Sequence, residues 1–151
     1  MAYDRADWHS DGDYPNDLPA ENGGTHIGLF LAWAISRGLE GEFHREESPD
    51  DLASVRARRM TGRDFLFRAC DGKFWEDDLS EEGNAFANAY YAAGIYFEDY
   101  EEILSADLPT MYHIEDSWAA FDILAPRLDQ RYAAWKSSQI GIRFGGSSWR
   151  S

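Results

Sequence analysis

Apolar side chains recur every three or four residues through much of this chain, which is the spacing of one face of an α-helix. In the segment HIGLFLAWAISRG, residues 26–38, this spacing is followed by Ile27, Phe30, Leu31, Ala34 and Ile35. Thr25 precedes the segment, and Gly38 offers a stop. The pattern predicts a mostly buried helix.

Start signals of helices follow in the next part of the chain. Ser48 stands before Pro49 and two aspartates; serine as the cap, proline at the first helical position and acids near the positive helix end favour a start there. Thr61 is followed three residues later by Asp64, a pair that is similar to a capping box. Two short helices are therefore predicted, after Ser48 and after Thr61.

A further helix is predicted to begin near Ser80. One of its stripes carries Phe86 and Tyr90, and an adjacent stripe, where another backbone could approach closely, carries Ala85, Ala89 and Ala93. Gly94 interrupts this helix. In the segment that follows, one helical face is shared by Tyr96, Tyr100, Ile103 and Leu104.

The last third of the chain repeats the helical spacing twice. Steps of four and three residues join Ile114, Trp118 and Phe121, and the same steps join Leu128, Tyr132 and Trp135. Pro126 is expected to restart a helix between these two sets. The tail, residues 140–151, is rich in Gly and Ser and is predicted to fray.

Strand signals are scarce, and only the short run TMYHI, residues 110–114, approaches the alternation of a β-strand. Residues 1–24 are rich in Asp, Gly, Asn and Pro, which predicts an ordered coil. With 151 residues, of which 44% are hydrophobic, the chain suffices for one core. We expect an all-α, mainly helical single globular domain over residues 1–151, with about five to seven helices and at most one short strand pair.

The charge of the chain adds most to what the sequence predicts about function. The chain carries 28 Asp and Glu against 14 Lys and Arg, a formal net charge of −14, whereas a magnitude of about 2–8 keeps a small domain soluble. Such a charge disfavours nucleic acid and anionic membranes as partners. Residues 74–126 contain no Lys or Arg, and their thirteen acids are Glu76, Asp77, Asp78, Glu81, Glu82, Glu98, Asp99, Glu101, Glu102, Asp107, Glu115, Asp116 and Asp122.

The segment GIYFEDYEEIL, residues 94–104, combines four of these carboxylates with six aromatic or aliphatic side chains. Like charges three or four positions apart disfavour a helix by about 0.2–0.5 kcal/mol per pair. A solvated helix face, or arginines of residues 56–63 that fold back onto the acids, would explain the segment without a partner. The functional alternative is a surface, left uncompensated by the chain's own cations, that attracts a cationic partner and offers aromatic contact area. Its expected partner-binding residues are Tyr96, Glu98, Asp99, Tyr100, Glu101, Glu102 and Asp107.

Metal-binding patterns are weak. The four histidines are scattered through different segments, and none has a second histidine at i+3 or i+4 to form the two-histidine face of a metal-binding helix: His9, His26, His44 and His113. The loop DGDYPND, residues 11–17, is dense in oxygen ligands, but Asn16 and Asn22 stand where an EF-hand needs Gly and Glu. We predict no metal site and no cofactor, and we interpret His26 as a core or capping residue.

Nucleophilic catalysis is not indicated either. The chain has no GxSxG motif, and neither Gly-Gly pair continues as a phosphate-binding loop. The single cysteine, Cys70, lies in the apolar context FLFRAC, which is typical of a buried, inert thiol. We predict no catalytic residues and a protein that is not an enzyme.

The expected location is the cytoplasm. The first residues, MAYDRADWHS, carry two acids and no apolar core behind a basic region, so a signal peptide is not predicted. No run approaches eighteen uninterrupted apolar residues, and a single cysteine allows no internal disulfide.

Three stretches carry a family resemblance: YDRADWHSDGDYPNDLPAENGGTHIGLFLAWAI, EEGNAFANAYY and YHIEDSWAAFD. They resemble a family of small, acidic bacterial cytosolic proteins of uncharacterised function, over nearly the whole chain, and this resemblance transfers no functional residues. The size and charge are also similar to those of the immunity proteins of bacterial toxin systems. That similarity implies an acidic single domain that binds and blocks a cognate toxin.

We therefore expect a non-enzymatic, immunity-type protein that binds and neutralises a basic toxin, for instance a nuclease, through residues 96–107, extended by residues 76–82. The four glutamates and aspartates of 98–102 would form salt bridges, and Tyr96 and Tyr100 would make contacts at the rim. Two alternatives stay open. One is a small metal-dependent or hydrolytic enzyme that uses the loop of residues 11–17 with His26, and the other is a housekeeping protein-binding module without a toxin.

Overall fold

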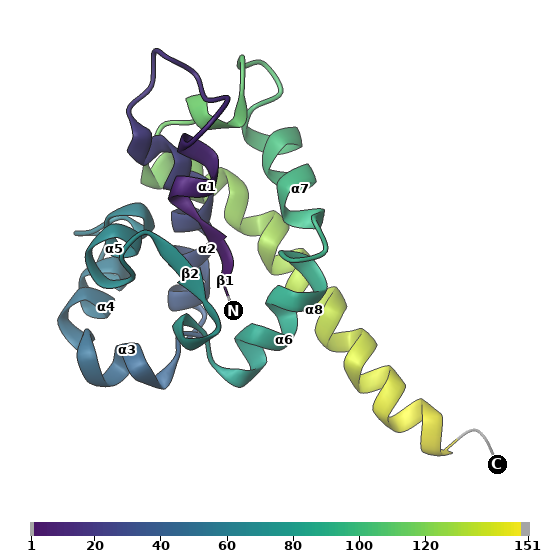
Figure 1. Ribbon diagram of the computed structural model, residues 1–151. Coiled ribbons are helices and arrows are strands. Elements are labelled where there is room, and N and C mark those ends of the chain that lie inside the picture. The colour runs from purple at the N-terminus through teal and green to yellow at the C-terminus, as the bar shows by residue number, and fades with distance from the viewer. Residues whose placement is uncertain (1, 149–151) are drawn as a thin grey trace.

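The computed structural model describes residues 2–148, with side chains as far as residue 139, and it is mainly helical (Figure 1). The α-helices of the described residues are α1 (Ala6–Ser10), α2 (Thr25–Ser36), α3 (Glu42–Glu47), α4 (Pro49–Arg56), α5 (Gly62–Ala69), α6 (Glu81–Tyr90), α7 (Ile95–Leu104) and α8 (Trp118–Ser148). The two strands β1 (Ala2–Arg5) and β2 (Lys73–Trp75) pair antiparallel. Three 3₁₀ turns complete the order: η1 (Ala20–Gly24), η2 (Glu76–Asp78) and η3 (Met111–His113). The predicted helical class, with one short strand pair, is confirmed.

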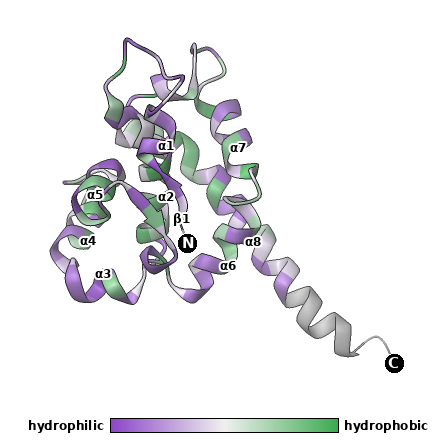
Figure 2. Ribbon diagram, in the orientation of Figure 1, coloured by the Kyte–Doolittle hydropathy of each residue, from purple (hydrophilic) through white to green (hydrophobic). Residues whose placement is uncertain are grey.

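Helix α2 is the centre of the molecule. Residues 25–35 are all buried, and Figure 2 shows hydrophobic residues concentrated along this helix. Helices α3, α4 and α5 lie on one side of α2, whereas α6, α7 and α8 lie on the other (Figure 1). The apolar run that predicted this helix therefore fills the core between two groups of helices.

Local sequence signals fix the ends of several helices as predicted. The Thr61 hydroxyl accepts the Asp64 backbone N–H at 3.1 Å at the start of α5, and the Ser80 hydroxyl accepts the Gly83 N–H at 3.1 Å at the start of α6. Each bond satisfies a backbone donor that the helix itself leaves unpaired. Gly94, with φ of 86°, separates α6 from α7; this left-handed conformation is accessible to glycine at little cost.

The N-terminal segment differs from the predicted coil, because β1, α1 and η1 all lie within residues 2–24. Neither α1 nor α3 was predicted, and the described residues contain eight α-helices, above the expected five to seven. The run TMYHI forms the turn η3, so the strand signal there is wrong. None of the helices in residues 2–148 is both long enough and apolar enough to cross a membrane.

Pro126 does not restart a helix but lies inside α8. Leu124 and Leu128, on either side of it, are both 0% exposed, so core packing holds both halves of the helix in place although proline lacks the N–H that a helix interior uses. The frayed tail predicted for residues 140–151 falls partly on the end of α8, which reaches Ser148, and partly on residues 149–151, outside the described residues.

Helices α2 and α5 approach each other closely at two glycines, whereas the alanine stripe of α6 makes no such contact. A methyl group added to Gly62 of α5 would lie 1.8 Å from the carbonyl oxygen of Gly28 in α2. The predicted stripe is instead exposed to solvent at Ala85, Ala89 and Ala93. The expectation of a close contact at that stripe is therefore wrong, and the contact between α2 and α5 takes its place.

Candidate functional site

The seven predicted partner-binding residues divide into a buried and an exposed group. Tyr96, Asp99 and Tyr100 are at most 3% exposed. The prediction that the two tyrosines lie at a surface rim is wrong, because the face of α7 that they share with its aliphatic residues packs into the core. The Tyr96 hydroxyl donates to the backbone carbonyl of His26. The exposed group consists of Glu98, Glu101, Glu102 and Asp107.

Asp99 joins α7 to α8 inside the protein. Its carboxylate accepts Arg127 Nη1 at 2.7 Å, Arg131 through two hydrogen bonds of 2.8 and 2.9 Å, and the Tyr90 hydroxyl at 2.7 Å. Burial by itself would raise the pKa of Asp99, but these hydrogen bonds outweigh it and lower the pKa. This carboxylate is therefore an internal anion and is not available to a partner in this conformation.

The exposed acids of α7 are only partly compensated. Glu102 accepts Arg127 Nη1 at 2.8 Å. Glu98, Glu101 and Asp107 form no ion pair within the part of the chain that the structure describes. These three residues, on α7 and in the loop after it, are the part of the predicted acidic surface that is both exposed and unpaired.

Cations from distant segments neutralise several other acids of the run 74–126. Arg58 donates to both oxygens of Asp122 at 3.0 and 2.6 Å, and Arg63 lies 3.3 Å from Asp116. These arginines come from the segment 56–63, but the acids that they contact lie outside residues 94–104, and the paired acids of α7 contact Arg127 and Arg131 of α8 instead. The expectation that the acidic run lacks internal partners is wrong for these residues, because sequence distance does not measure spatial distance.

A second polar group lies where β1, α1 and α2 meet. It consists of Asp4, His9 and His26. His9 Nε2 lies 2.7 Å from Asp4 Oδ1, and His26 Nε2 lies 3.0 Å from Asp4 Oδ2. One nitrogen or oxygen atom from each residue falls within 4.8 Å of the other two. We call this group the Asp4 cluster.

Two tyrosines surround the Asp4 cluster. The Tyr91 hydroxyl donates to Asp4 Oδ2 at 2.6 Å, and the Tyr112 hydroxyl lies 2.7 Å from His9 Nδ1. The backbone N–H of Arg5 donates to Asp4 Oδ1 at 2.8 Å. His26 Nδ1 is buried and has no partner among the described residues. The carboxylate is thus the convergence point of four donors, which is how a buried anion is stabilised without water.

These contacts decide the ionisation state of the Asp4 cluster. Burial alone would raise the pKa of Asp4, yet the hydrogen bonds from His26 and His9 outweigh it and hold the pKa well below its usual range. Burial lowers the pKa of His26, and the bond to Asp4 opposes this shift without cancelling it. Asp4 is therefore a carboxylate, and His26 favours its neutral form.

A third group combines His44, Cys70 and Asp78. Asp78 Oδ1 lies 2.7 Å from His44 Nε2, and Cys70 Sγ lies 3.6 Å from that same nitrogen. A catalytic relay needs the two partners on different imidazole nitrogens, so this arrangement is not a nucleophile–base–acid triad. Burial, with the charge of Asp78, raises the pKa of the thiol far above its usual value. The predicted inert thiol fits this setting, although Cys70 is only partly buried.

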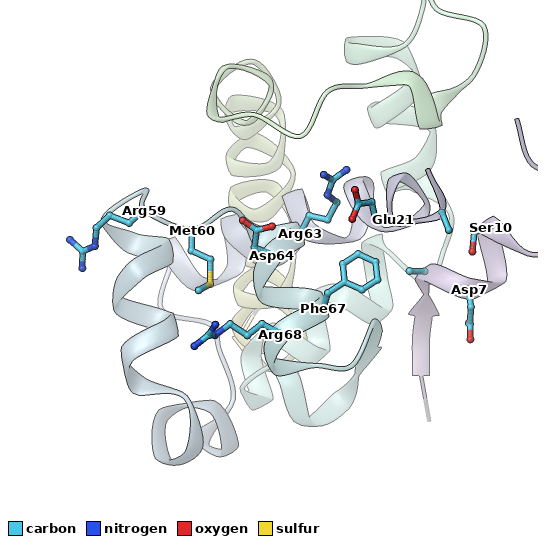
Figure 3. Close-up of a pocket in the computed structure, with 11 residues that line it drawn as sticks. Asp7, Ser10, Glu21, Arg59, Met60, Arg63, Asp64, Phe67 and Arg68 are labelled. Carbon is cyan, nitrogen blue, oxygen red and sulfur yellow. The ribbon is translucent and has the colours of Figure 1, made fainter. Parts of the chain in front are cut away.

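A groove on the surface has mixed chemistry. It measures about 760 Å³ and lies between α5 with its preceding turn on one side and α1 with η1 on the other (Figure 3). Arg59, Arg63 and Arg68 line it together with three acids: Asp7, Glu21 and Asp64. Because cations and anions alternate around the single exposed ring of Phe67, the groove presents no uniform charge to a ligand.

Sequence reasoning missed the Asp4 cluster because its members are five and twenty-two residues apart and come from three elements. The enzyme alternative combined His26 with the loop of residues 11–17. Instead, the structure pairs His26 with Asp4, whereas Asp17 of the loop lies 3.1 Å from His113. The only signal in the sequence is the segment YDRADWH, residues 3–9, in which two aspartates and one histidine lie close together.

Comparison with known proteins shows the family of this chain. A sequence-family model described as "Domain of unknown function (DUF7832)" matches residues 2–114, from β1 through η3. No curated protein and no solved structure matches the chain. The matched residues include the Asp4 cluster and the whole of α7, and they end before α8.

Proposed function

We propose, from the premise that the chain belongs to the DUF7832 family of domains of unknown function, that this protein is a non-enzymatic binding protein of the immunity type. In this proposal it binds a basic bacterial toxin and neutralises it by covering its active site. The proposal retains the exposed part of the acidic surface on α7 and assigns no role in partner contact to its buried residues.

The observation that carries the proposal is the set of unpaired carboxylates on and after α7. Glu98, Glu101 and Asp107 are exposed and form no ion pair within the described residues, while the chain has a formal net charge of −14. Clustered charge of one sign raises the rate at which a partner of opposite charge arrives. An inhibitor that must capture a toxin before it acts gains most from a fast encounter.

Apolar contact area at this surface comes from a residue other than the predicted tyrosines. Leu108 directly follows Asp107 and is 40% exposed. Interfaces gain much of their affinity from a few apolar or aromatic side chains that become buried on binding, surrounded by polar contacts. We assign Leu108 to that central contact and the three unpaired carboxylates to its surroundings.

The non-enzymatic assignment is supported by the third polar group. The raised pKa of the Cys70 thiol favours its neutral form, which is a poor nucleophile, and the imidazole nitrogen 3.6 Å from its sulfur, His44 Nε2, also contacts Asp78. Covering a toxin requires surface complementarity and no reaction, so the described features suffice for the proposed role.

The test is co-expression with the basic protein encoded by the gene adjacent to this one in its genome. We expect the two proteins to purify as a stoichiometric complex and the chain to restore growth. The triple variant Glu98→Lys, Glu101→Lys, Asp107→Lys should lower the association rate by about 10-fold or more and abolish the protection.

The matched control places the same charge change on the opposite side of α2. Glu46, Glu47 and Asp50 lie in α3 and α4, are exposed and form no ion pair within the described residues. The triple variant with Lys at these positions should bind the toxin like the wild type and should match the thermal stability of the α7 triple variant. Equal loss of binding in both triple variants would contradict the assignment of the α7 surface. If the adjacent gene encodes no basic protein that binds this chain, the toxin hypothesis is rejected and the housekeeping binding module remains.

A further inference from the structure

Buried carboxylates in this protein have two kinds of counter-charge. Among the described residues, the buried acids are Asp4, Glu40, Asp78 and Asp99, each at most 6% exposed. Arginines contact Glu40 and Asp99. Within the described residues, the ion-pair partners of Asp4 and Asp78 are histidines alone, and the guanidinium of Arg5, next to Asp4 in sequence, contacts Asp7 instead.

A buried carboxylate with only imidazole partners lacks a permanent cation. Buried charges in proteins are paired with an opposite charge or coordinate a metal ion. The imidazoles of His9 and His26 lie within hydrogen-bond distance of the Asp4 oxygens, but no Lys or Arg side chain among the described residues pairs with this carboxylate. A cation at the convergence of Asp4, His9 and His26 would supply that charge.

We propose that the Asp4 cluster binds one divalent transition-metal ion, with Zn²⁺ as the best chemical match, through an Asp4 carboxylate oxygen and the Nε2 atoms of His9 and His26. Two imidazoles and one carboxylate are ligands that Zn²⁺ prefers, whereas Ca²⁺ and Mg²⁺ require oxygen ligands. This site is independent of the proposed function, because it shares no residue with the acidic surface of α7 and is tested by a different measurement.

The geometry needs only small changes to accept the ion. Ligands held about 2.0–2.2 Å from a tetrahedral Zn²⁺ lie about 3.3 Å from one another. His9 Nε2 lies 2.7 Å from Asp4 Oδ1, and His26 Nε2 lies 3.0 Å from the other oxygen, Oδ2. One ligand atom of each residue lies within 4.8 Å of the other two, so shifts of at most about 1.5 Å bring the three atoms to this separation. The ion replaces the protons that these pairs share, and both imidazoles already present the nitrogen that would coordinate.

The surrounding residues orient the proposed ligands. Tyr112 accepts or donates at His9 Nδ1 and thereby fixes the ring whose Nε2 faces Asp4, and Tyr91 fixes the carboxylate. Such second-layer contacts tune metal affinity. His9 has 17% of its side chain exposed, so the ion enters beside this ring, whereas His26, at 1%, lies behind it. The ion would fasten β1, α1 and α2 to one another.

The test uses Co²⁺ as a spectroscopic substitute for Zn²⁺ on the full chain. We expect the wild type to bind one equivalent, with visible cobalt bands and no thiolate-to-cobalt charge-transfer band, and its melting temperature to rise. His9→Ala should lose both effects. The matched control is His113→Ala, because the His113 side chain is also 17% exposed and also contacts an aspartate, and it should retain both.

A second pair of variants keeps the test valid if His9→Ala does not fold. Tyr112→Phe removes only the hydroxyl beside His9 and should weaken Co²⁺ binding by about 10–100-fold. Tyr14→Phe is the control, since its ring contacts Tyr112 but its hydroxyl donates to the Pro19 carbonyl, away from the cluster. The proposal is overturned if the wild type binds no Co²⁺, if Tyr112→Phe binds like Tyr14→Phe, or if a thiolate band appears that Cys70→Ser removes, which would place the ion at His44 and Asp78.

Discussion

At the scale of single residues, the role of each carboxylate depends on which cation reaches it. Asp99 and Glu102 are close neighbours on α7 and both contact Arg127. Asp99 is 3% exposed and also holds Arg131 and Tyr90, whereas the side chain of Glu102 is 66% exposed. Water competes strongly for an exposed pair and weakly for a buried one, so the two residues should differ in their contribution to stability.

Replacement of Asp99 by Asn should therefore destabilise the protein. The amide keeps the shape but leaves Arg127 and Arg131 without their buried anion, and we expect the free energy of unfolding to fall by about 1.5–3 kcal/mol. Glu102→Gln is the control and should cost less than about 1 kcal/mol. Urea denaturation of both variants measures the difference, and equal losses would show that burial does not set the strength of these contacts.

The pKa directions of the same buried acids predict how stability depends on pH. The pKa of Asp99 is lowered in the folded protein, and so is that of Glu40, in both cases because hydrogen bonds from arginines outweigh burial. A depressed folded pKa contributes stability that is complete above the unfolded pKa, about 4, and is lost as the pH falls through the folded value.

We expect the free energy of unfolding to decline from about pH 5 downward. In Asp99→Asn this decline should be shallower than in the wild type, since one of the responsible groups no longer titrates. Chemical denaturation at a series of pH values provides the measurement. An identical slope in the variant would mean that Asp99 does not contribute to acid sensitivity.

Residue-scale roles were only partly predictable from the sequence. The spacing of Tyr96 and Tyr100 with Ile103 and Leu104 identifies an apolar helix face that packs against the core; the two tyrosines are buried, and the two aliphatic residues are partly buried. The error lay in treating tyrosines beside carboxylates as surface contacts. A tyrosine can be buried when its hydroxyl finds an internal acceptor, and for Tyr96 that acceptor is a carbonyl on α2, seventy positions away in the sequence.

At the scale of elements, the contact between α2 and α5 depends on two glycines. A methyl group on Gly62 would lie 1.8 Å from the Gly28 carbonyl oxygen and 2.9 Å from the side chain of Ala32. Distances this short force the two helices apart, and overpacking of a close contact costs about 1–3 kcal/mol or more. Alanine has the higher helix propensity, by about 1 kcal/mol, so propensity and packing predict opposite signs.

We expect Gly62→Ala to destabilise the protein by at least about 1 kcal/mol, because packing outweighs propensity here. Ala89→Leu is an informative control, since it adds three carbons on α6 where the side chain is exposed, and it should change stability by less than about 0.5 kcal/mol. Thermal denaturation monitored by circular dichroism compares the two. A stabilised Gly62→Ala variant would contradict the close approach of α2 and α5.

The position of Pro126 inside α8 allows a stabilising substitution. In a continuous helix, proline cannot donate to the carbonyl four residues earlier, which belongs to Asp122, and this loss costs about 3 kcal/mol in a helix interior. Pro126 is exposed, so Pro126→Ala leaves no cavity. We expect a gain of about 1–3 kcal/mol in the free energy of unfolding. If a second helix began at Pro126, where proline is favoured, the substitution would instead be neutral or destabilising.

Elements with local start and stop signals were predictable, and elements fixed by distant contacts were not. Thr61, Ser80 and Gly94 act on backbone groups within three or four residues, and each marks the boundary that the sequence predicted. Strand β1 pairs with β2, whose residues come some seventy positions later, for example Arg5 opposite Lys73. No local pattern announces such a partner, which is why the N-terminal segment was predicted as coil.

At the scale of the whole molecule, the fold brings together chemistry that is dispersed along the chain. Asp4, His9 and His26 meet only because β1 and α1 pack against the start of α2, so their proximity could not be predicted from their spacing. The acidic run was visible in the sequence, but its partners Arg127 and Arg131 come from α8. That helix lies beyond residues 2–114, which the family model matches.

The net charge should make the stability of the fold depend on salt. Ion pairs within the protein weaken when salt is added, but so does the mutual repulsion of an excess of fourteen negative charges. Repulsion should dominate, because acids such as Glu98, Glu101 and Asp107 have no ion-pair partner in the described residues. We expect the melting temperature to rise as NaCl increases from about 0.01 M to about 1 M, over which the screening length falls from about 30 Å to about 3 Å.

The control for this effect is the triple variant Glu98→Gln, Glu101→Gln, Asp107→Asn, in which the loss of three acids changes the formal net charge from −14 to −11. Salt also strengthens apolar burial in both proteins, so only the difference between them reports repulsion at α7. The variant should melt higher than the wild type at low salt and converge with it at high salt. If the melting temperature of the wild type falls as salt is added, internal ion pairs such as Asp99 with Arg131 outweigh the repulsion. Little unpaired negative charge would then be left at α7 for a cationic partner.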